Sequence, residues 1–349
     1  MDPEFLWYIP NQAEPGHRGD DVVDGHNSLE TLTAQARALE EHGWAGALIG
    51  TGWGRPDTFT VATALAARTT TFKPLIAVRP GYWQPAQFAA ATATLHHLTY
   101  GRVLINVVSG KDHPAAYGDD DQADRYARTK EFMRIVRALW EHPEVSIKGE
   151  HFQVTDSTVQ PRLPGGHPPL YFGGASDAAE RVAATEADVQ LFWGEPRDGI
   201  RERIDRLRRL SDELGRELPP LEFGLRITTV VRDTTAEAWA EAESRVADLA
   251  AGRGLMPRDP NRHAAVGQQR LLDLAARGDV LDDNLYTAPG RYGAGGAGTT
   301  WLVGSAEDVA RSLRRYQDLG ISRFILSDTP YLTEITRQGA ALLPLLRAT

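Results

Sequence analysis

Short apolar segments alternate with longer segments of helical periodicity along most of the chain. The apolar segments predict eight buried strands, at residues 6–9, 45–49, 73–78, 103–108, 170–173, 189–193, 223–231 and 324–327. The segments between them predict helices, including one after Ser28 and others at 58–67, 85–98 and 126–140. This alternation is typical of βα units whose parallel strands form one sheet.

Eight such units predict an α/β fold of the (β/α)₈ TIM-barrel type, in which the strands form a closed barrel. An open doubly wound sheet is the main alternative, and this number of strands argues against it. A hairpin predicted around residues 148–150 interrupts the alternation. The single domain is expected to span residues 6–349, since residues 1–5 resemble a cloning remnant. In such barrels the loops after the carboxyl ends of the strands build the active site.

The stretch 250–300 breaks the pattern between the seventh and eighth units. It is rich in Gly, Arg and Asp around one helix-like segment, residues 261–276. A connection of this length can cover the barrel mouth as a lid, and a surface insertion without that role is the alternative. Residues 293–298 satisfy G-x-G-x-x-G, but a strand-like segment follows them where a dinucleotide site needs a helix, so we discount that motif.

Composition limits the partners and the chemistry. The chain has 349 residues, no cysteine and a net charge of -9, which argues against nucleic acid or an anionic membrane as partner and excludes disulfides and thiolate chemistry. We expect a cytoplasmic location, because no apolar run is long enough to cross a bilayer and no segment resembles a signal peptide. No metal-ligand spacing and no G-x-S-x-G motif occurs, so the chemistry is expected from a bound cofactor.

Residues 171–177, YFGGASD, carry the most specific chemical signal. A short apolar run ends in two glycines, and Ser176 then stands where it can cap a following helix. The amide N–H groups of a first helical turn are unpaired and the helix dipole favours an anion, so the backbone at Ala175 and Ser176 predicts a phosphate site. An ordinary strand-to-helix turn is the alternative.

Nine segments, in order along nearly the whole chain, resemble one known family. They are LIGTG at 48–52, AVRP at 77–80, GRVLINVVSG at 101–110, RY at 125–126, PLYFGGASD at 169–177, WGEP at 193–196, FGLR at 223–226, VGQQR at 266–270 and GGAGT at 295–299. Together they resemble the bacterial luciferase-like flavin monooxygenases, most closely the alkanesulfonate monooxygenases. The resemblance implies a barrel that receives reduced FMN from a separate NAD(P)H-dependent flavin reductase and uses O₂ to oxygenate a small molecule. It also implies a homodimer or homotetramer and, in the sulfonate branch, cleavage of a carbon–sulfur bond.

The positions that match the family predict an FMN site built from Thr51, Asn106, Ser109, Tyr126, Ala175 and Ser176. Asn106 and Ser109 lie at the mouth end of the fourth predicted strand, where an amide and a hydroxyl can hydrogen-bond the edge of a flavin ring. Tyr126 matches a family tyrosine that gives its hydroxyl to the phosphate. The alternatives are a turn-forming role for Ser109 and a packing role for Tyr126.

Arg226 is the candidate catalytic residue. It lies in the seventh predicted strand, where an unpaired buried guanidinium is costly, so it predicts a bound sulfonate or negative charge that develops during the reaction with O₂. An ion pair with a barrel carboxylate is the alternative. Trp193 ends the sixth strand and is expected to line the substrate cavity or, alternatively, to pack at the barrel rim.

The chain departs from the sulfonate enzymes at family active-site positions. Arg55 replaces a cysteine, Thr228 a histidine and Thr329 a tyrosine, and Arg291 is the nearest equivalent of a lid arginine. We take these four residues as candidate substrate-binding positions. Because the departures remove groups that bind substrate or carry protons, three other hypotheses stay open: the same chemistry on a nitrogen-containing or natural-product substrate, an oxidoreductase that uses the deazaflavin F420, and a flavin-binding barrel without turnover.

Overall fold

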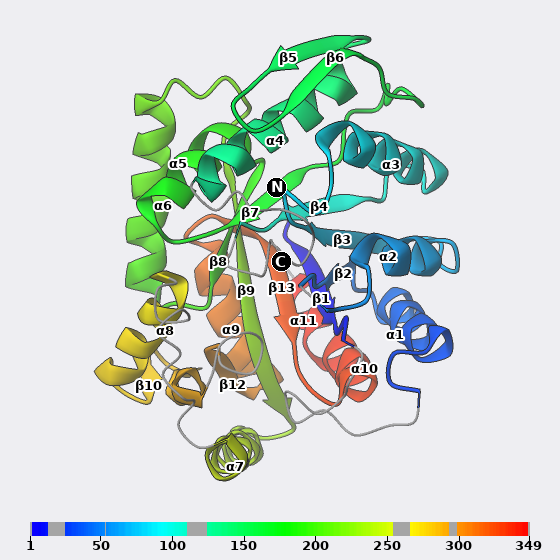
Figure 1. The fold of residues 1–349 in the computed structure, drawn as a ribbon. Coiled ribbons are helices and arrows are strands. Elements are labelled where there is room, and N and C mark those ends of the chain that lie inside the picture. The colour runs from blue at the N-terminus through cyan, green and yellow to red at the C-terminus, as the bar shows by residue number, and fades with distance from the viewer. Residues whose placement is uncertain are drawn as a thin grey trace.

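The computed structural model describes residues 2–12, 25–52, 54–109, 124–253, 266–292 and 299–347 (Figure 1). Eight parallel strands form a barrel: β1 (Glu4–Ile9), β2 (Gly46–Ile49), β3 (Lys73–Val78), β4 (Leu104–Val107), β7 (Leu170–Gly173), β8 (Val189–Trp193), β9 (Glu222–Arg232) and β13 (Ile321–Ser327). The barrel is closed because β9 pairs with both β8 and β13. The predicted TIM barrel is therefore confirmed.

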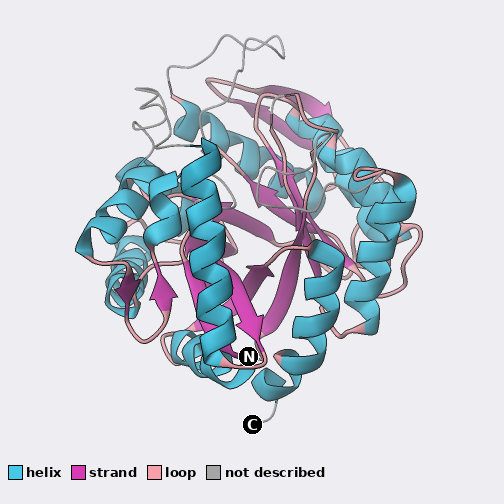
Figure 2. Cartoon of the chain, turned by 90° about the horizontal axis from the view of Figure 1, so that it is seen from below, coloured by secondary structure: helices cyan, strands magenta, loops and turns pink. Residues whose placement is uncertain are grey.

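Helices surround the barrel (Figure 2): α1 (Leu29–Glu41), α2 (Thr58–Ala66), α3 (Pro85–Leu98), α4 (Arg125–Glu141), α5 (Asp177–Glu186), α6 (Arg197–Glu213), α9 (Ala306–Gln317), α10 (Tyr331–Ala341) and α11 (Leu343–Arg347). Several begin at side chains that the sequence marks as caps. Ser28 accepts a hydrogen bond from the Thr31 amide at 3.1 Å, as expected for the start of α1. Within the described residues, no helix has the length and apolar composition needed to cross a bilayer.

Apolar side chains fill both sides of the barrel wall. In β1, Leu6 and Tyr8 belong to the cluster inside the barrel, while Trp7 and Ile9 belong to the larger cluster between the strands and the helices. Successive side chains of a strand point to opposite faces, so a strand buried on both faces is apolar throughout. This explains why the barrel strands read as continuous apolar runs. Each large apolar side chain buried in this way contributes roughly 1.5–3 kcal/mol.

The barrel begins earlier in the chain than predicted. β1 starts at Glu4, and Phe5 is 2% exposed and stacks on Phe324 with 5.2 Å between the ring centroids. These two residues therefore take part in the fold, although they belong to the five that resemble a cloning remnant. The predicted hairpin is confirmed, with antiparallel strands β5 (Val145–Lys148) and β6 (Gln153–Ser157).

The sheet continues beyond the barrel from the seventh barrel strand, β9. β9 pairs with β8 as far as Arg226 and with β13 as far as Thr228. From Thr228 onward it pairs with β12 (Trp301–Ser305), and β11 (Leu285–Tyr286) continues this sheet on the far side of β12. A further short strand, β10 (Val280–Leu281), forms the edge.

Much of the connection between β9 and β13 is a packed extension of the barrel. Helix α7 (Thr235–Arg253) and the 3₁₀ helix η2 (Ala288–Tyr292) enclose a separate apolar cluster with β9 and β12. Helix α8 (Val266–Arg277) lies within the stretch where one helix was expected. The prediction of one helix within 250–300 is thus incomplete, because it misses the strands β10 and β11 and the helix η2. Strands of two residues are too short to produce a periodic pattern. Residues 254–265 and the glycine pattern at 293–298 lie outside the described residues.

A buried group of charges joins α7 and α10 to the end of the barrel. Arg232 Nη1 lies 3.4 Å from Glu334 Oε1 and 3.6 Å from Asp328 Oδ2. Arg245 of α7 pairs with Asp328 and donates a hydrogen bond to the carbonyl of Thr329 at 2.7 Å. Burial, and after it the nearby Asp328 carboxylate, raises the pKa of the Glu334 carboxyl to about 7.

We predict that stability falls as the pH rises through the pKa of Glu334. Between roughly pH 4.3 and 7 the folded protein binds more protons at Glu334 than the unfolded chain does, so the stabilisation present at low pH is lost on titration. Glu334→Gln should flatten this part of the pH dependence, measured by urea unfolding at a series of pH values. The exposed Glu307→Gln serves as the control. An identical pH slope in Glu334→Gln and wild type would contradict the raised pKa.

Candidate functional site

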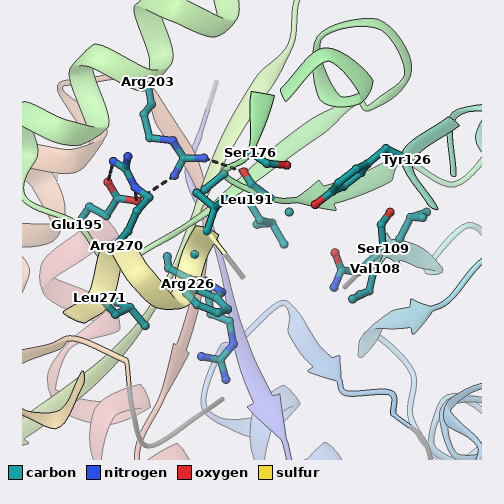
Figure 3. A pocket seen from close by; sticks show the side chains of 18 of the residues that line it. Val108, Ser109, Tyr126, Ser176, Leu191, Glu195, Arg203, Arg226, Arg270 and Leu271 are labelled. Carbon is teal, nitrogen blue, oxygen red and sulfur yellow. Dashed lines mark hydrogen bonds and ion pairs between the residues drawn. The ribbon is translucent and has the colours of Figure 1, made fainter. Parts of the chain in front are cut away.

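A cavity of about 270 Å³ lies at the barrel mouth, at the carboxyl ends of β4, β7, β8 and β9 (Figure 3). Seven of the residues predicted for the site line it: Asn106, Ser109, Tyr126, Ala175, Ser176, Trp193 and Arg226. Figure 3 shows Ser109 and Tyr126 on one side and a group of charged side chains on the other. The structure thus brings together residues that are more than a hundred positions apart in the chain.

The turn between β7 and α5 has the predicted helix cap. Ser176 Oγ accepts a hydrogen bond from the Ala179 amide at 3.3 Å. Gly174 has no room for a side chain, because a Cβ there would lie 2.5 Å from Ala179 Cβ. The Gly174 carbonyl accepts a hydrogen bond from Arg203 Nη2 at 2.7 Å, which holds the turn in place. Ala175 and Ser176, at the start of the helix, therefore line the cavity with amide groups suited to an anion.

Two hydrogen-bond acceptors face the same cavity at the end of β4, from Asn106 in the strand and Ser109 just after it. Ser109 Oγ lies 2.5 Å from Thr129 Oγ1, whose own proton goes to the carbonyl of Arg125 at 2.7 Å. Since a hydroxyl has one proton, Ser109 donates to Thr129 and keeps its lone pairs for a ligand. Asn106 Oδ1 is buried and has no hydrogen-bond partner within the described residues. Both atoms suit the N–H or O–H groups of a polar ligand.

The start of α4 supplies an aromatic hydroxyl, from Tyr126, and a cation, from Arg125. Asp124 caps the helix by accepting a hydrogen bond from the Ala127 amide at 2.9 Å. The Arg125 guanidinium lies over the ring of Tyr126, 4.9 Å from its centroid. In Figure 3 the Tyr126 hydroxyl points across the cavity toward Ser176. Arg125 also lines the cavity, and sequence reasoning missed it although the Arg-Tyr pair is one of the family-like segments.

Arg226 places a positive charge where the barrel interior meets the cavity. The residue is 9% exposed, and its guanidinium carbon lies 4.8 Å from the centroid of the Tyr8 ring. The register of β8 and β9 places Trp193 beside Arg226, so both side chains leave the barrel wall on the same side. The predicted pair of cation and aromatic wall is therefore contiguous, and a buried guanidinium of this kind suits a negatively charged group.

Ion pairs connect helix α8 with the turn before α5 (Figure 3). The Glu195 carboxylate accepts hydrogen bonds from Arg270 Nε of α8 and from Arg203 Nη1 of α6, each at 3.0 Å. Arg203 also pairs with buried Glu180 at 3.2 Å. Because Arg203 holds the Gly174 carbonyl as well, one set of charges fixes both α8 and the anion-binding turn.

Arg270 ties α8 to the rim of the cavity. Its hydrogen bonds to Glu195 raise the pKa of the guanidinium, against the opposing effect of burial. Gly267 lies against Trp193, since a Cβ on it would be 3.3 Å from the indole ring. Glu195 and Arg270 belong to family-like segments, but their pairing over 75 positions has no local sequence signal.

Five predicted residues lie outside this cavity: Thr51, Arg55, Thr228, Arg291 and Thr329. Thr51 and Arg55 line a second cavity, beyond β2 and β3. The Thr228 hydroxyl lies 3.3 Å from Ser327 Oγ, within the barrel wall. The cofactor or substrate role of each of these residues stays a prediction.

The other two outlying residues are engaged elsewhere. Arg291 donates to the Ala275 carbonyl at 2.7 Å and pairs with Asp279, both in the extension. Thr329 donates its amide to Asp328 at 2.8 Å and accepts from Arg245, so its backbone belongs to the buried charge group beside α10. The structure therefore does not bring these positions to the cavity that holds Arg226.

Comparisons with known proteins agree with the fold. The family model described as luciferase-like monooxygenase matches residues 3–323. A riboflavin lyase solved with modified FMN and its substrate riboflavin superposes with a TM-score of 0.79 at 22% identity, over 99% of this chain and 92% of that chain. EDTA monooxygenase from Chelativorans sp. BNC1 gives 0.77 at 16%, over 100% and 94%.

A third similar structure carries a different cofactor. An F420-dependent secondary alcohol dehydrogenase, solved with an F420–acetone adduct, superposes with a TM-score of 0.69 at 18% identity, over 99% of this chain and 100% of that chain. At these identities the likeness extends to the fold alone. The choice of cofactor and substrate therefore has to be argued from the residues around the cavity.

We predict that Arg270 holds α8 in place. Arg270→Ala should increase amide hydrogen exchange across α8 about fivefold, because a charge-assisted hydrogen bond is worth roughly 1.5–3 kcal/mol when buried and less at a partly exposed side chain. The control is Arg277→Ala, which removes an exposed pair with Asp198 on the same helix. Equal exchange in Arg270→Ala and wild type would show that the pair with Glu195 does not fix α8.

Proposed function

We propose, given that the chain belongs to the luciferase-like monooxygenase family, that it is a two-component monooxygenase. In this proposal it binds FMN that a separate NAD(P)H-dependent flavin reductase has reduced, and uses O₂ to oxygenate a small organic substrate. The observation that carries the proposal is the pairing, in one cavity, of an anion-binding helix start with two unused acceptors. Bound reduced FMN supplies the electrons that activate O₂.

The two sides of the cavity suit the two ends of FMN. The amide groups at Ala175 and Ser176, with Tyr126 and Arg125 opposite, suit the phosphate. Asn106 Oδ1 and Ser109 Oγ suit the N–H groups of the ring edge and the hydroxyls of the ribityl chain. A buried acceptor without a donor costs about 1–3 kcal/mol, and a bound ligand with an N–H or O–H group removes that cost.

Arg226 is proposed as the catalytic cation. Its charge is held over Tyr8 and beside Trp193, where it can stabilise an anionic substrate group or negative charge that develops as O₂ reacts. A preorganised charge in a site shielded from water acts more strongly than one in bulk solvent. Trp193 and α8 supply that shielding, since Gly267 packs on the indole ring.

For the substrate we propose an organosulfonate or related organosulfur compound, with cleavage of the carbon–sulfur bond and release of sulfite. The resemblance to alkanesulfonate monooxygenases and the buried cation Arg226 support this class. The alternative substrates are nitrogen-containing compounds or natural-product intermediates, because Arg55, Thr228 and Thr329 replace family active-site residues. We further propose a homodimer or homotetramer, as the resemblance implies, and a cytoplasmic location, as expected from the sequence.

An F420-dependent oxidoreductase is the second candidate, favoured by the fold shared with the alcohol dehydrogenase. A barrel that binds flavin without turnover is the third. Anaerobic titration with reduced FMN and with F420, followed by addition of O₂ and a panel of sulfonates, separates them. Sulfite released from a sulfonate in the presence of reduced FMN and O₂ supports the main proposal, whereas hydride transfer to or from F420 without need for O₂ would replace it.

We predict that a negative charge at position 176 weakens FMN binding. Ser176→Asp keeps a good helix cap but places a carboxylate at the phosphate, so the dissociation constant should rise about tenfold or more. Ser176→Asn, a neutral cap of the same shape, is the matched control, and riboflavin, which lacks the phosphate, should be affected little. Fluorescence titration measures both flavins. If the two variants bind FMN equally, the phosphate does not lie at this helix.

We predict that Arg226→Ala lowers turnover by roughly 10²–10³ while FMN affinity changes little, because one preorganised charge is removed. O₂ should then still oxidise the reduced FMN, but the reaction should form hydrogen peroxide and little oxygenated product. Arg226→Lys should restore little, since an ammonium does not reproduce the planar guanidinium. Product formed per reduced FMN consumed is the measurement, with the exposed Arg201→Ala as control. A wild-type yield and rate in Arg226→Ala would assign Arg226 a structural role.

A further inference from the structure

A second cavity, of about 370 Å³, lies at the same rim, between the loops that follow β2 and β3. It adjoins the first cavity across one pair of strands. The register of β3 and β4 places Ala77 beside Asn106 and Val78 beside Val107. Ala77 and Val78 line the second cavity, whereas Asn106 and Val107 line the first. A molecule in the second cavity would therefore lie next to the proposed flavin site.

One wall of this second cavity is aromatic. Phe59 and Trp83 lie 5.6 Å apart and Trp83 and Phe88 6.1 Å apart, measured between ring centroids. Phe88 is fully buried and anchors the group in the outer core, while Phe59 and Trp83 are partly buried. Tyr82 also lines the cavity. Rings held in this way offer a rigid apolar surface for a planar ligand.

Besides the aromatic rings, two arginines line this cavity, Arg55 and Arg79. Arg55 is exposed, and no carboxylate of the described residues pairs with it. Asp57 is the one acidic residue among those that line the cavity in the described part of the chain, and its Oδ1 caps α2 by accepting hydrogen bonds from the amide and the hydroxyl of Thr60, each at 2.7 Å. Asp57 is thus already engaged in capping the helix, and Arg55 brings an exposed positive charge to the cavity.

Arg55 also stands close to the proposed catalytic cation. A Cβ built on Gly50 would lie 3.2 Å from the Tyr8 hydroxyl and 3.6 Å from Arg55 Nη1, so these two groups are neighbours. Arg226 lies over the ring of the same tyrosine. Tyr8 is therefore the neighbour of one cation from each cavity, Arg226 from the first and Arg55 from the second.

We propose that the second cavity binds the substrate and selects an aromatic compound that carries a sulfonate or carboxylate group. The ring packs on Phe59 and Trp83, and the oxyanion binds Arg55, whose planar guanidinium group can donate two hydrogen bonds. This inference rests on the proposed function, because it assigns the first cavity to the flavin. It replaces a simple alkyl sulfonate by an aryl anion as the preferred substrate class.

Binding to the flavin-free protein tests the inference. Calorimetric titration compares three ligands. Benzenesulfonate has both the ring and the charge, ethanesulfonate has the charge without the ring, and benzamide has the ring without the charge. Benzenesulfonate should bind at least about tenfold more tightly than the other two, since each lacks either the ring or the charge. Arg55→Ala should weaken it about tenfold, while Arg68→Ala, an exposed arginine just after α2, should not. The Trp83 indole N–H resonance, assigned with Trp83→Phe, should shift on binding.

Three outcomes would overturn the inference: equal binding of benzenesulfonate and ethanesulfonate, wild-type affinity in Arg55→Ala, or an unmoved Trp83 resonance. Displacement of benzenesulfonate by FMN would assign the second cavity to the flavin and would overturn it too. These readouts do not depend on catalysis, so a failure to oxygenate with reduced FMN would count against the proposed function alone. Ser176→Asp should weaken FMN and leave benzenesulfonate binding unchanged.

Discussion

Strand β9 hydrogen-bonds to β8, β13 and β12, and this triple pairing is the constraint on which the site depends. Pairing with β8 and β13 closes the barrel and brings the carboxyl ends of all eight strands to one rim. Because β9 then continues past Thr228, it also supports the extension that carries α8. Arg226 stands at the last shared position with β8, where closure and cavity meet.

Ion pairs between side chains hold helix α8 and the turn before α5 in place at the rim. Glu195 and Arg203 are nearly buried, so each would be costly alone, and their mutual hydrogen bonds offset that cost. Together they connect Arg270 of α8 with the carbonyl of Gly174. The position of the covering helix and the shape of the anion-binding turn are therefore set by the same side chains.

The two cavities at the barrel mouth suit different kinds of ligand. The first cavity offers backbone amides and two acceptors, which suit a ligand with a phosphate at one end and N–H or O–H groups at the other. The second offers aromatic rings and arginines, which suit a flat anion. Tyr8 is the neighbour of both Arg226 and Arg55, one cation from each cavity.

The sequence by itself determined the features that depend on near neighbours. The apolar runs predicted all eight barrel strands, and Ser176 predicted the cap of α5, because strand burial and helix capping act within a few residues. Resemblance then placed Asn106, Ser109 and Arg226 at one rim. The two-residue strands β10 and β11 had no periodicity to reveal them.

Only the tertiary structure decided which distant residues meet. It paired Glu195 with Arg270, brought Arg125 to the cavity, and placed Thr51 and Arg55 in a second cavity that Arg226 does not line. It also left Thr228, Thr329 and Arg291 in the barrel wall, the buried charge group and the extension. The physical reason is that these contacts follow from barrel closure and strand register, which are set by long-range hydrogen bonds that no local pattern encodes.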